Sequence, residues 1–285
     1  MPSSSDSFSG YQRQRFNRCR EDQPTPTSEV TDTALLVEEI PLTISVNGIA
    51  YAVMMVTPVQ LDAFVVGFAR SEGIIEHINE VRDIVTQKAH SSMGIDSLSV
   101  DLVVSPRRLA QFKQRKQTHL GATGCGLCGI ESLAQAMPEL PLLPASEPIQ
   151  LSILAPLRQQ LSRFQVLGNQ TGAVHAALLI SPTGDPIICM EDIGRHNALD
   201  KIIGYALQHN IALHNHSVLM SSRCSTELVQ KAVRVGLSRL IHLASPSTLA
   251  VQLAIHYGLT LIHLPKQDAP RIFAQTFKTH STYAL

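Results

Sequence analysis

Short apolar runs alternate with helical patterns through the second half of the chain, and this rhythm restricts the fold more than any other feature. The expected strands cover residues 173–180, 186–190, 217–220, 239–243 and 260–264, and the expected helices cover 197–209, 226–235 and 248–257. Strands that alternate with helices predict parallel βαβ units. We therefore expect an α/β domain over residues 149–285, with a mixed or parallel sheet and a further helix over 149–164.

The first part of the chain has a different pattern, in which strands cluster. The expected strands cover residues 41–46, 49–56, 83–88 and 98–104. The first two flank Asn47-Gly48, a strong signal for a β-hairpin. Thr57 and Pro58 predict the N-cap and first turn of a helix that ends near residue 71. These elements indicate a smaller α+β part over residues 34–137.

Two segments lack apolar periodicity. Residues 1–33 are rich in Ser, Gln, Pro and Arg, which predicts a disordered tail. Residues 138–148 contain four prolines, which predicts an extended linker between the two parts.

Composition and charge exclude several classes of protein. The 23 basic and 23 acidic residues give no net charge, which argues against a general nucleic-acid binder. No apolar run approaches the ~20 residues of a membrane span. No signal-peptide pattern is found near residue 1, and five cysteines do not suit a disulfide framework. We expect a cytoplasmic protein.

A glycine-rich loop at residues 121–129 presents Cys125 and Cys128 with C-x-x-C spacing. The helical pattern that follows at 130–137 would place both thiols near a helix N-terminus, where the dipole stabilises a thiolate. Four interpretations compete: a structural zinc site, a thioredoxin-like dithiol, a zinc deaminase and a sulfur carrier. The chain has no second C-x-x-C, and it lacks the H-x-E and P-C-x-x-C pattern of the deaminases. A flexible loop suits sulfur transfer, because the sulfur must reach two partners. The residues alone leave the choice open.

Polar residues gather where three expected strands lead into helices. The junctions carry Glu191, Asp192, Gly194, Arg195, His196 and Asn197; then Ser221, Ser222 and Arg223; then Ser245, Ser247 and Thr248. Carboxyl ends of parallel strands meet at one sheet edge, where helix N-termini can bind anions. Arginine forks add recognition of phosphate. The sequence predicts a site for a phosphorylated, nucleotide-like ligand.

Other polar residues carry weaker signals. Thr171 and Gly172 form a turn before His175, which could donate a proton or bind a ligand. Cys189 and Cys224 are expected to be packed residues. No histidine spacing suggests a metal site.

Two motifs resemble the formate dehydrogenase accessory sulfurtransferase family (FdhD). They are Thr123-Gly124-Cys125-Gly126-Leu127-Cys128-Gly129 and the run Gly194-Arg195-His196-Asn197-Ala198-Leu199-Asp200-Lys201, and similarity extends over about residues 37–273. The resemblance implies a cytidine-deaminase-like α/β domain, for which a homodimer is expected. It also implies that sulfur passes from a cysteine desulfurase to the molybdenum bis-(molybdopterin guanine dinucleotide) cofactor of formate dehydrogenase or a related molybdoenzyme. The cofactor would be a sulfur acceptor and not permanently bound.

The resemblance also assigns roles to residues. Cys125 would carry the persulfide, and Cys128 would be its partner. The strand-end residues would meet the guanine nucleotide ends of the cofactor, together with a segment near the C-terminus that is typically aromatic and contains arginine. In this chain that segment is Leu264, Pro265, Lys266, Gln267, Asp268 and Ala269, where Lys266 keeps a positive charge without an arginine fork. A non-catalytic cofactor-binding chaperone, whose two thiols clamp a ligand or zinc, is the alternative.

Overall fold

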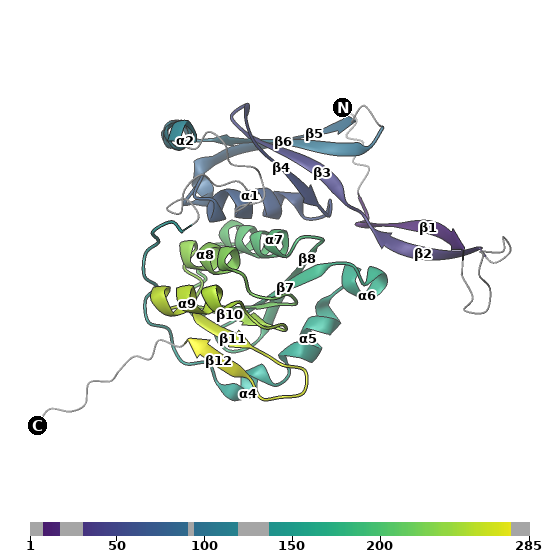
Figure 1. Ribbon diagram of the computed structural model, residues 1–285. Helices are drawn as coiled ribbons and strands as arrows, with labels where there is room; N and C mark the ends of the chain where they lie inside the picture. Colours follow the sequence, from purple (N-terminus) through teal and green to yellow (C-terminus); the bar gives the residue numbers. More distant parts are fainter. Residues whose placement is uncertain (1–7, 18–30, 91–93, 119–136, 275–285) are drawn as a thin grey trace, which may run out of the picture.

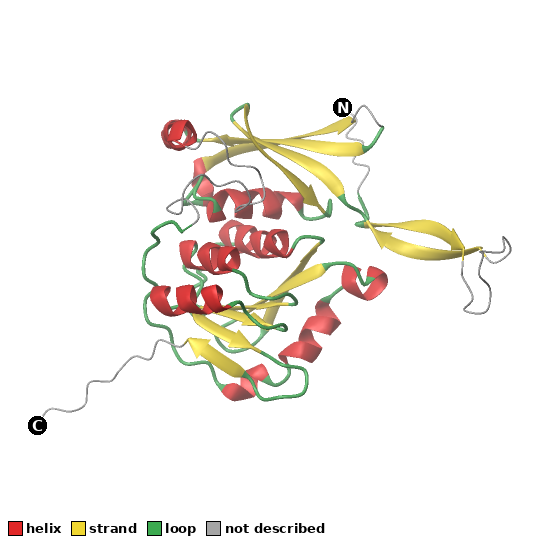
Figure 2. Cartoon of the chain, in the orientation of Figure 1, coloured by secondary structure: helices red, strands yellow, loops and turns green. Residues whose placement is uncertain are grey.

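The computed structural model describes residues 8–17, 31–90, 94–118 and 137–274. Their strands form sheets of two, four and six strands. Figures 1 and 2 show the four-stranded sheet above helix α1, then a helical layer containing α7 and α8, then the six-stranded sheet with α4 and α5 beyond it. The protein is therefore a layered, mixed α/β structure.

The two-stranded sheet corrects the prediction that residues 1–33 are wholly disordered. Strands β1 (Tyr11–Asn17) and β2 (Thr31–Val37) pair antiparallel. Glu38, just after β2, accepts hydrogen bonds from the Gly10 backbone N–H and the Gln12 amide, both at 2.8 Å. Polar cross-strand contacts stabilise this pairing, so a search for apolar periodicity could not detect β1.

The four-stranded sheet matches the prediction for the N-terminal part. Its order is β4 (Ile49–Val56), β3 (Ile40–Val46), β6 (Asp96–Val104) and β5 (Val81–His90). The hairpin between β3 and β4 is confirmed: Asn47 and Gly48 have φ of 47° and 75°. Two positive φ values in succession are typical of a type I′ turn.

Alternate residues of this sheet pack against α1 (Leu61–Ser71). The predicted N-cap role of Thr57 is wrong, because the N-cap of α1 is Gln60. Thr57 lies before the helix and is fully buried. The sequence also did not predict η1 (Ile78–Glu80) or α2 (Pro106–Thr118). Arg108 of α2 is buried and pairs with Glu76 and Glu80 at 2.7 Å, so part of the basic stretch anchors a helix.

The six-stranded sheet is mixed. Its order is β12 (Arg271–Ala274), β11 (Thr260–His263), β10 (Arg239–His242), β9 (Ser217–Met220), β7 (His175–Ile180) and β8 (Pro186–Asp192). Strands β9, β10 and β11 are parallel, as the alternation predicted. The β7–β8, β7–β9 and β11–β12 pairs are antiparallel.

Helices cover both faces of this sheet. Alternate residues of β7 show the division: Ala177 and Leu179 belong to one core cluster, while Leu178 and Ile180 belong to another. The first cluster includes residues of α7 (Arg195–Gln208), α8 (Thr226–Arg234) and α9 (Thr248–Tyr257), and the second includes residues of α4 (Leu151–Leu154) and α5 (Leu157–Phe164). The single helix predicted over 149–164 is thus two helices, separated at Pro156, which has no backbone N–H to continue the first.

Helices α1 and α7 cross at two glycines and join the upper and lower layers. A Cβ atom added to Gly67 would lie 1.7 Å from the Asp200 carbonyl oxygen, and one added to Gly204 would lie 1.8 Å from that of Ala63. The two backbones are therefore in contact, and no larger residue fits at either position.

Replacing Gly67 with alanine tests this crossing. Alanine in a helix normally gains about 1 kcal/mol over glycine. Here we expect the free energy of unfolding to fall by about 2–3 kcal/mol in urea denaturation, because the added methyl overpacks the interface. Gly48→Ala has nothing within 4 Å and should lose only the roughly 1–2 kcal/mol of left-handed strain. A Gly67→Ala protein at least as stable as the wild type would contradict the crossing.

Candidate functional site

The strand-to-helix junctions predicted from the sequence lie at one edge of the six-stranded sheet. The register places Met220 of β9 beside His242 of β10, and His242 beside His263 of β11. The N-terminal end of β7 and the C-terminal end of β8 meet at the same edge, where His175 pairs with Asp192. We call this set of strand ends the sheet edge.

Glu191 at the sheet edge has a structural role. Its carboxylate accepts hydrogen bonds from the backbone N–H groups of Val166, Leu167 and Gly168 at 2.7–2.8 Å. These donors begin helix α6 (Leu167–Thr171). Glu191 is buried, and both of its oxygens are used within the fold.

Asp192 and Asn197 are also used within the fold. Asp192 is fully buried and forms an ion pair with Lys201 at 2.8 Å. It also accepts hydrogen bonds from the Asn197 amide at 2.8 Å and the Thr57 backbone N–H at 3.2 Å. Asn197 donates further to the Met55 carbonyl oxygen at 2.8 Å. The most acidic part of the predicted site therefore holds the N-terminal layer to the sheet.

Arg195 and His196 are partly buried in the first turn of α7. His196 Nε2 lies 3.4 Å from Ser225 Oγ and 3.9 Å from the Glu227 carboxylate, so the N-termini of α7 and α8 are adjacent. Burial, with the charge of Arg195 second, lowers the pKa of His196 to about 4. Burial and then Arg195 also lower the pKa of His175. Arg195 is thus a cation that acts on two imidazoles, both of which are neutral at neutral pH.

At the second junction, two serines form hydrogen bonds within the fold and the arginine is exposed. Ser221 pairs with Ala176 of β7: its Oγ accepts from the Ala176 N–H, and its own N–H donates to the Ala176 carbonyl, both at 2.9 Å. Ser222 is buried and donates to the Arg223 carbonyl oxygen at 3.1 Å. Arg223 is exposed.

The turn before His175 closes helix α6. Thr171 Oγ1 donates to the Leu167 carbonyl oxygen at 2.8 Å. Gly172 is the C-cap with φ of 66°, a conformation that favours glycine. Both residues lie near the sheet edge, where they shape the chain that leads to His175.

The segment at 264–269 links β11 to β12. Leu264 is buried, and its carbonyl oxygen accepts from Arg158 at 2.5 Å. Lys266, Gln267, Asp268 and Ala269 are exposed, and Pro265 is partly buried. Asp268 pairs with Arg271 at 2.7 Å. Lys266 therefore supplies an exposed positive charge beside the sheet edge.

His242 is a candidate that the sequence reasoning missed. It is fully buried, and its Nδ1 lies 3.1 Å from the Ser222 carbonyl oxygen, which can only accept a hydrogen bond. Nε2 is buried without a partner among the described residues. Burial lowers the pKa of His242 to about 4. Its position in the sequence could have identified it: His242 and His263 lie at the ends of strands, next to strand ends that were already predicted to form the site.

A second missed network lies behind the sheet edge. Lys231 of α8 donates to Ser71 Oγ of α1 at 2.8 Å and to Asp200 of α7 at 2.9 Å, and it pairs with Glu72 at 3.1 Å. The two carboxylates raise the pKa of Lys231 against the effect of burial. This cation fixes three helices relative to one another.

Cys125 and Cys128 lie outside the described residues. The described chain ends at Thr118 of α2 and resumes at Met137, whose sulfur lies 4.0 Å from the Gln230 amide of α8. The hydroxyl group of Tyr257 in α9 donates a hydrogen bond of 3.1 Å to the carbonyl oxygen of Pro138, the residue after Met137. The described chain thus resumes beside α8 and α9.

The two described cysteines are packed residues, as predicted. Burial raises the pKa of Cys189 to about 12, with Glu191 adding to the effect. Burial likewise raises the pKa of Cys224 to about 12, with Glu227 adding to it. Neither thiol forms an appreciable thiolate at neutral pH.

Two features are absent from the described residues. These residues contain no helix long and apolar enough to cross a membrane. They also contain no group of three or more His, Cys, Asp or Glu side chains that could hold a metal ion.

Comparison with known proteins places this mixed α/β chain in a family. The model of the FdhD/NarQ family matches residues 37–280. Relatives named sulfur carrier protein FdhD include one from Burkholderia mallei, 39% identical over 79% of this chain and 83% of its own, and one from Variovorax paradoxus, 37% identical over 84% of each. The chain belongs to the FdhD/NarQ family.

A solved structure shares the fold. It is the crystal structure of a "putative formate dehydrogenase accessory protein" from Desulfotalea psychrophila, with a TM-score of 0.66 and 22% identity. The match covers 93% of this chain and 96% of the other.

The buried His242 predicts a pH dependence of stability. Its pKa in the folded protein, about 4, lies below the ordinary histidine value of 6.5, so its contribution to stability is present above pH 6.5 and is lost as the pH falls toward 4. Between pH 7 and 5, urea denaturation should show a loss of about 2 kcal/mol that His242→Gln removes. Replacing the exposed His256 with glutamine should leave the slope unchanged. If the free energy of unfolding of His242→Gln fell with pH as steeply as that of the wild type, the lowered pKa of His242 would be contradicted.

Proposed function

We propose that this chain is a sulfur carrier, in which Cys125 takes sulfur from the persulfide of a cysteine desulfurase and passes it to the molybdenum bis-(molybdopterin guanine dinucleotide) cofactor. Delivery of this sulfur would support the activity of formate dehydrogenase or a related molybdoenzyme. Family membership supports the proposal, as do relatives named sulfur carrier protein FdhD that are 37–39% identical.

The thiol environments favour the C-x-x-C pair, and the resemblance to the family motif assigns the carrier role within that pair to Cys125. Cys189 and Cys224 have pKa values raised to about 12, so neither is suited to attack a persulfide. The thiolate is the nucleophile in sulfur exchange. Cys125 and Cys128 instead stand in a glycine-rich C-x-x-C segment, which suits a reactive pair.

The proposed transfer balances without an external oxidant. The Cys125 thiolate attacks the terminal sulfur of the donor persulfide, the donor S–S bond breaks, and the donor leaves as a thiolate. Cys125 then carries the persulfide. Attack of the Cys128 thiolate on the inner sulfur of Cys125 would break the persulfide S–S bond, pass the outer sulfur as sulfide to the cofactor and leave a disulfide between the two cysteines. The cysteines thus supply both electrons, and a dithiol reductant would restore both thiols before the next transfer.

The sheet edge is the proposed binding surface for the nucleotide part of the acceptor. Arg195, Arg223 and Lys266 can offer positive charge to phosphate, and helix N-termini add backbone donors. Glu191 and Asp192 do not recognise the base in this proposal, because their oxygens are already hydrogen-bonded. A homodimer and a cytidine-deaminase-like α/β domain remain part of the proposal.

The alternative function is a non-catalytic chaperone of the cofactor, whose two cysteines clamp a ligand or zinc. It differs in one measurable respect: a clamp holds stoichiometric zinc or ligand and gains no sulfur from the donor.

Replacing Cys125 with alanine tests the carrier role. After incubation with a cysteine desulfurase and cysteine, mass spectrometry should show one added sulfur atom on Cys125 of the wild type and none in Cys125→Ala. Activation of the client dehydrogenase should be lost as well. Cys189→Ala is the matched control and should keep both properties, because the Cys189 thiol stays protonated. Full client activation by Cys125→Ala, or stoichiometric zinc without a persulfide, would refute sulfur transfer.

Replacing Arg195 with glutamine tests the acceptor site. With GDP as the probe of the nucleotide part, calorimetry should show affinity reduced about tenfold or more, because a hydrogen bond to a charged group is worth about 1.5–3 kcal/mol. Arg163→Gln, on the exposed side of α5, should bind GDP as the wild type does. Equal GDP affinity in both variants would contradict the proposal that the nucleotide binds at the sheet edge.

A further inference from the structure

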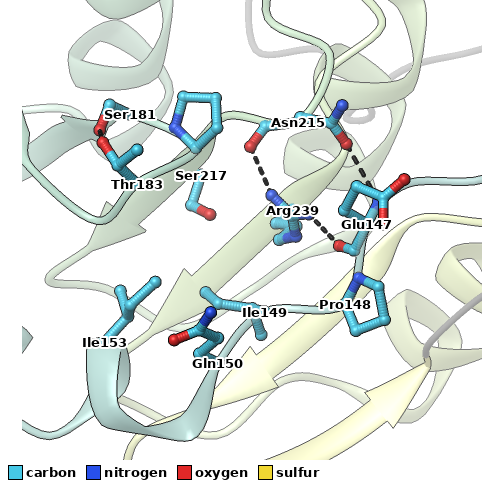
Figure 3. A pocket seen from close by; sticks show the side chains of 11 residues that line it. Glu147, Pro148, Ile149, Gln150, Ile153, Ser181, Thr183, Asn215, Ser217 and Arg239 are labelled. Carbon is cyan, nitrogen blue, oxygen red and sulfur yellow. Dashed lines mark hydrogen bonds between the residues drawn. The ribbon is translucent and has the colours of Figure 1, made fainter.

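A pocket of about 450 Å³ lies at the opposite edge of the six-stranded sheet (Figure 3). Residues 147–150 and Ile153 form one wall, and the turn after β7, with Ser181 and Thr183, forms another. Ser217 and Arg239, which begin β9 and β10, complete it. Its volume lies in the range of small-molecule sites.

Arg239 is a buried cation in this pocket. The residue is 4% exposed, and its guanidinium donates to the carbonyl oxygens of Asn215 and Glu147, as the dashed lines in Figure 3 show. Nε is buried without a partner in the described part of the chain. Burial lowers the pKa of Arg239 more than the Glu147 charge raises it. Within the described part of the chain, no carboxylate lies within ion-pair distance of this guanidinium, so two carbonyl dipoles and the charge of Glu147, which is beyond that distance, offset a charge that would favour an anion.

The remaining lining limits which anion fits. Ile149 and Ile153 are apolar, whereas Ser181, Thr183 and Ser217 supply hydroxyl groups. Glu147 is exposed at the pocket, and its negative charge brings the net formal charge of the lining residues to zero. A ligand with one negative charge is therefore favoured over a polyanion, and the isoleucines favour an apolar body.

We propose that this pocket binds a small organic monocarboxylate, with its carboxylate beside the Arg239 guanidinium and its apolar part against Ile149 and Ile153. The site is separate from the sheet edge and does not depend on the proposed sulfur transfer. If Arg239 merely anchors residues 147–150, the pocket has no reason to distinguish a carboxylate from a neutral molecule of the same shape.

Hexanoate and its neutral counterpart hexanamide provide the test. Calorimetry on the full chain should show hexanoate binding at least about tenfold more tightly than hexanamide, because the amide lacks the charge that Arg239 would meet. Arg239→Gln should abolish this preference, and Arg239→Lys should restore part of it. Arg163→Gln, outside the pocket, should leave hexanoate binding unchanged.

Glu147→Gln keeps the proposal testable if Arg239→Gln fails to fold. Removing the Glu147 charge leaves the carbonyl contact intact and should tighten hexanoate by about two- to fivefold. Equal binding of hexanoate and hexanamide, binding of neither, or hexanoate affinity unchanged in Glu147→Gln would each overturn the proposal.

Discussion

The fully buried ion pair between Lys201 and Asp192 fixes how the parts of this protein meet. Lys201 Nζ also donates to the carbonyl oxygens of Glu191 at 2.9 Å and Thr57 at 3.2 Å. One ammonium group thus connects the middle of α7, the end of β8 and the chain beyond β4. A buried charge is tolerated only while its partners surround it. The crossing at Gly67 and Gly204 brings the backbones close enough for these contacts to form.

This arrangement changes how the polar residues of the sheet edge should be understood. The residues with the strongest acceptors are used to hold layers together, whereas the cations are left at or near the surface. Arg195 is placed by its position in the first turn of α7, directly after the segment that the buried pair holds. The edge is therefore better suited to contact phosphate than to read a base through carboxylates.

Local patterns in the sequence predicted much of the fold. The Asn47-Gly48 hairpin and the strands from β9 to β11 follow from turn chemistry and periodicity, and both were confirmed. Features that depend on distant contacts were not predictable in this way. Thr57 reads as an N-cap, yet it bonds Asp192, 135 residues away. Lys231 bonds Ser71 across 160 residues. The sequence predicted correctly which strand ends lie at the same edge of the sheet. It could not predict which of their side chains form hydrogen bonds or ion pairs within the fold, because those partners are distant in the sequence.

The neutral histidines at the sheet edge have a consequence for how the protein would respond to its surroundings. His196 and His242 have pKa values lowered to about 4, and that of His175 is lowered in the same direction. Ordinary histidines gain charge as a compartment acidifies toward pH 6. His196 and His242 do not, so near this pH the positive charge of the surface comes mainly from its arginines and lysine. The charge that this surface presents should hence change little across mild acidification, whereas a thiol that takes part in the proposed sulfur transfer would respond to pH.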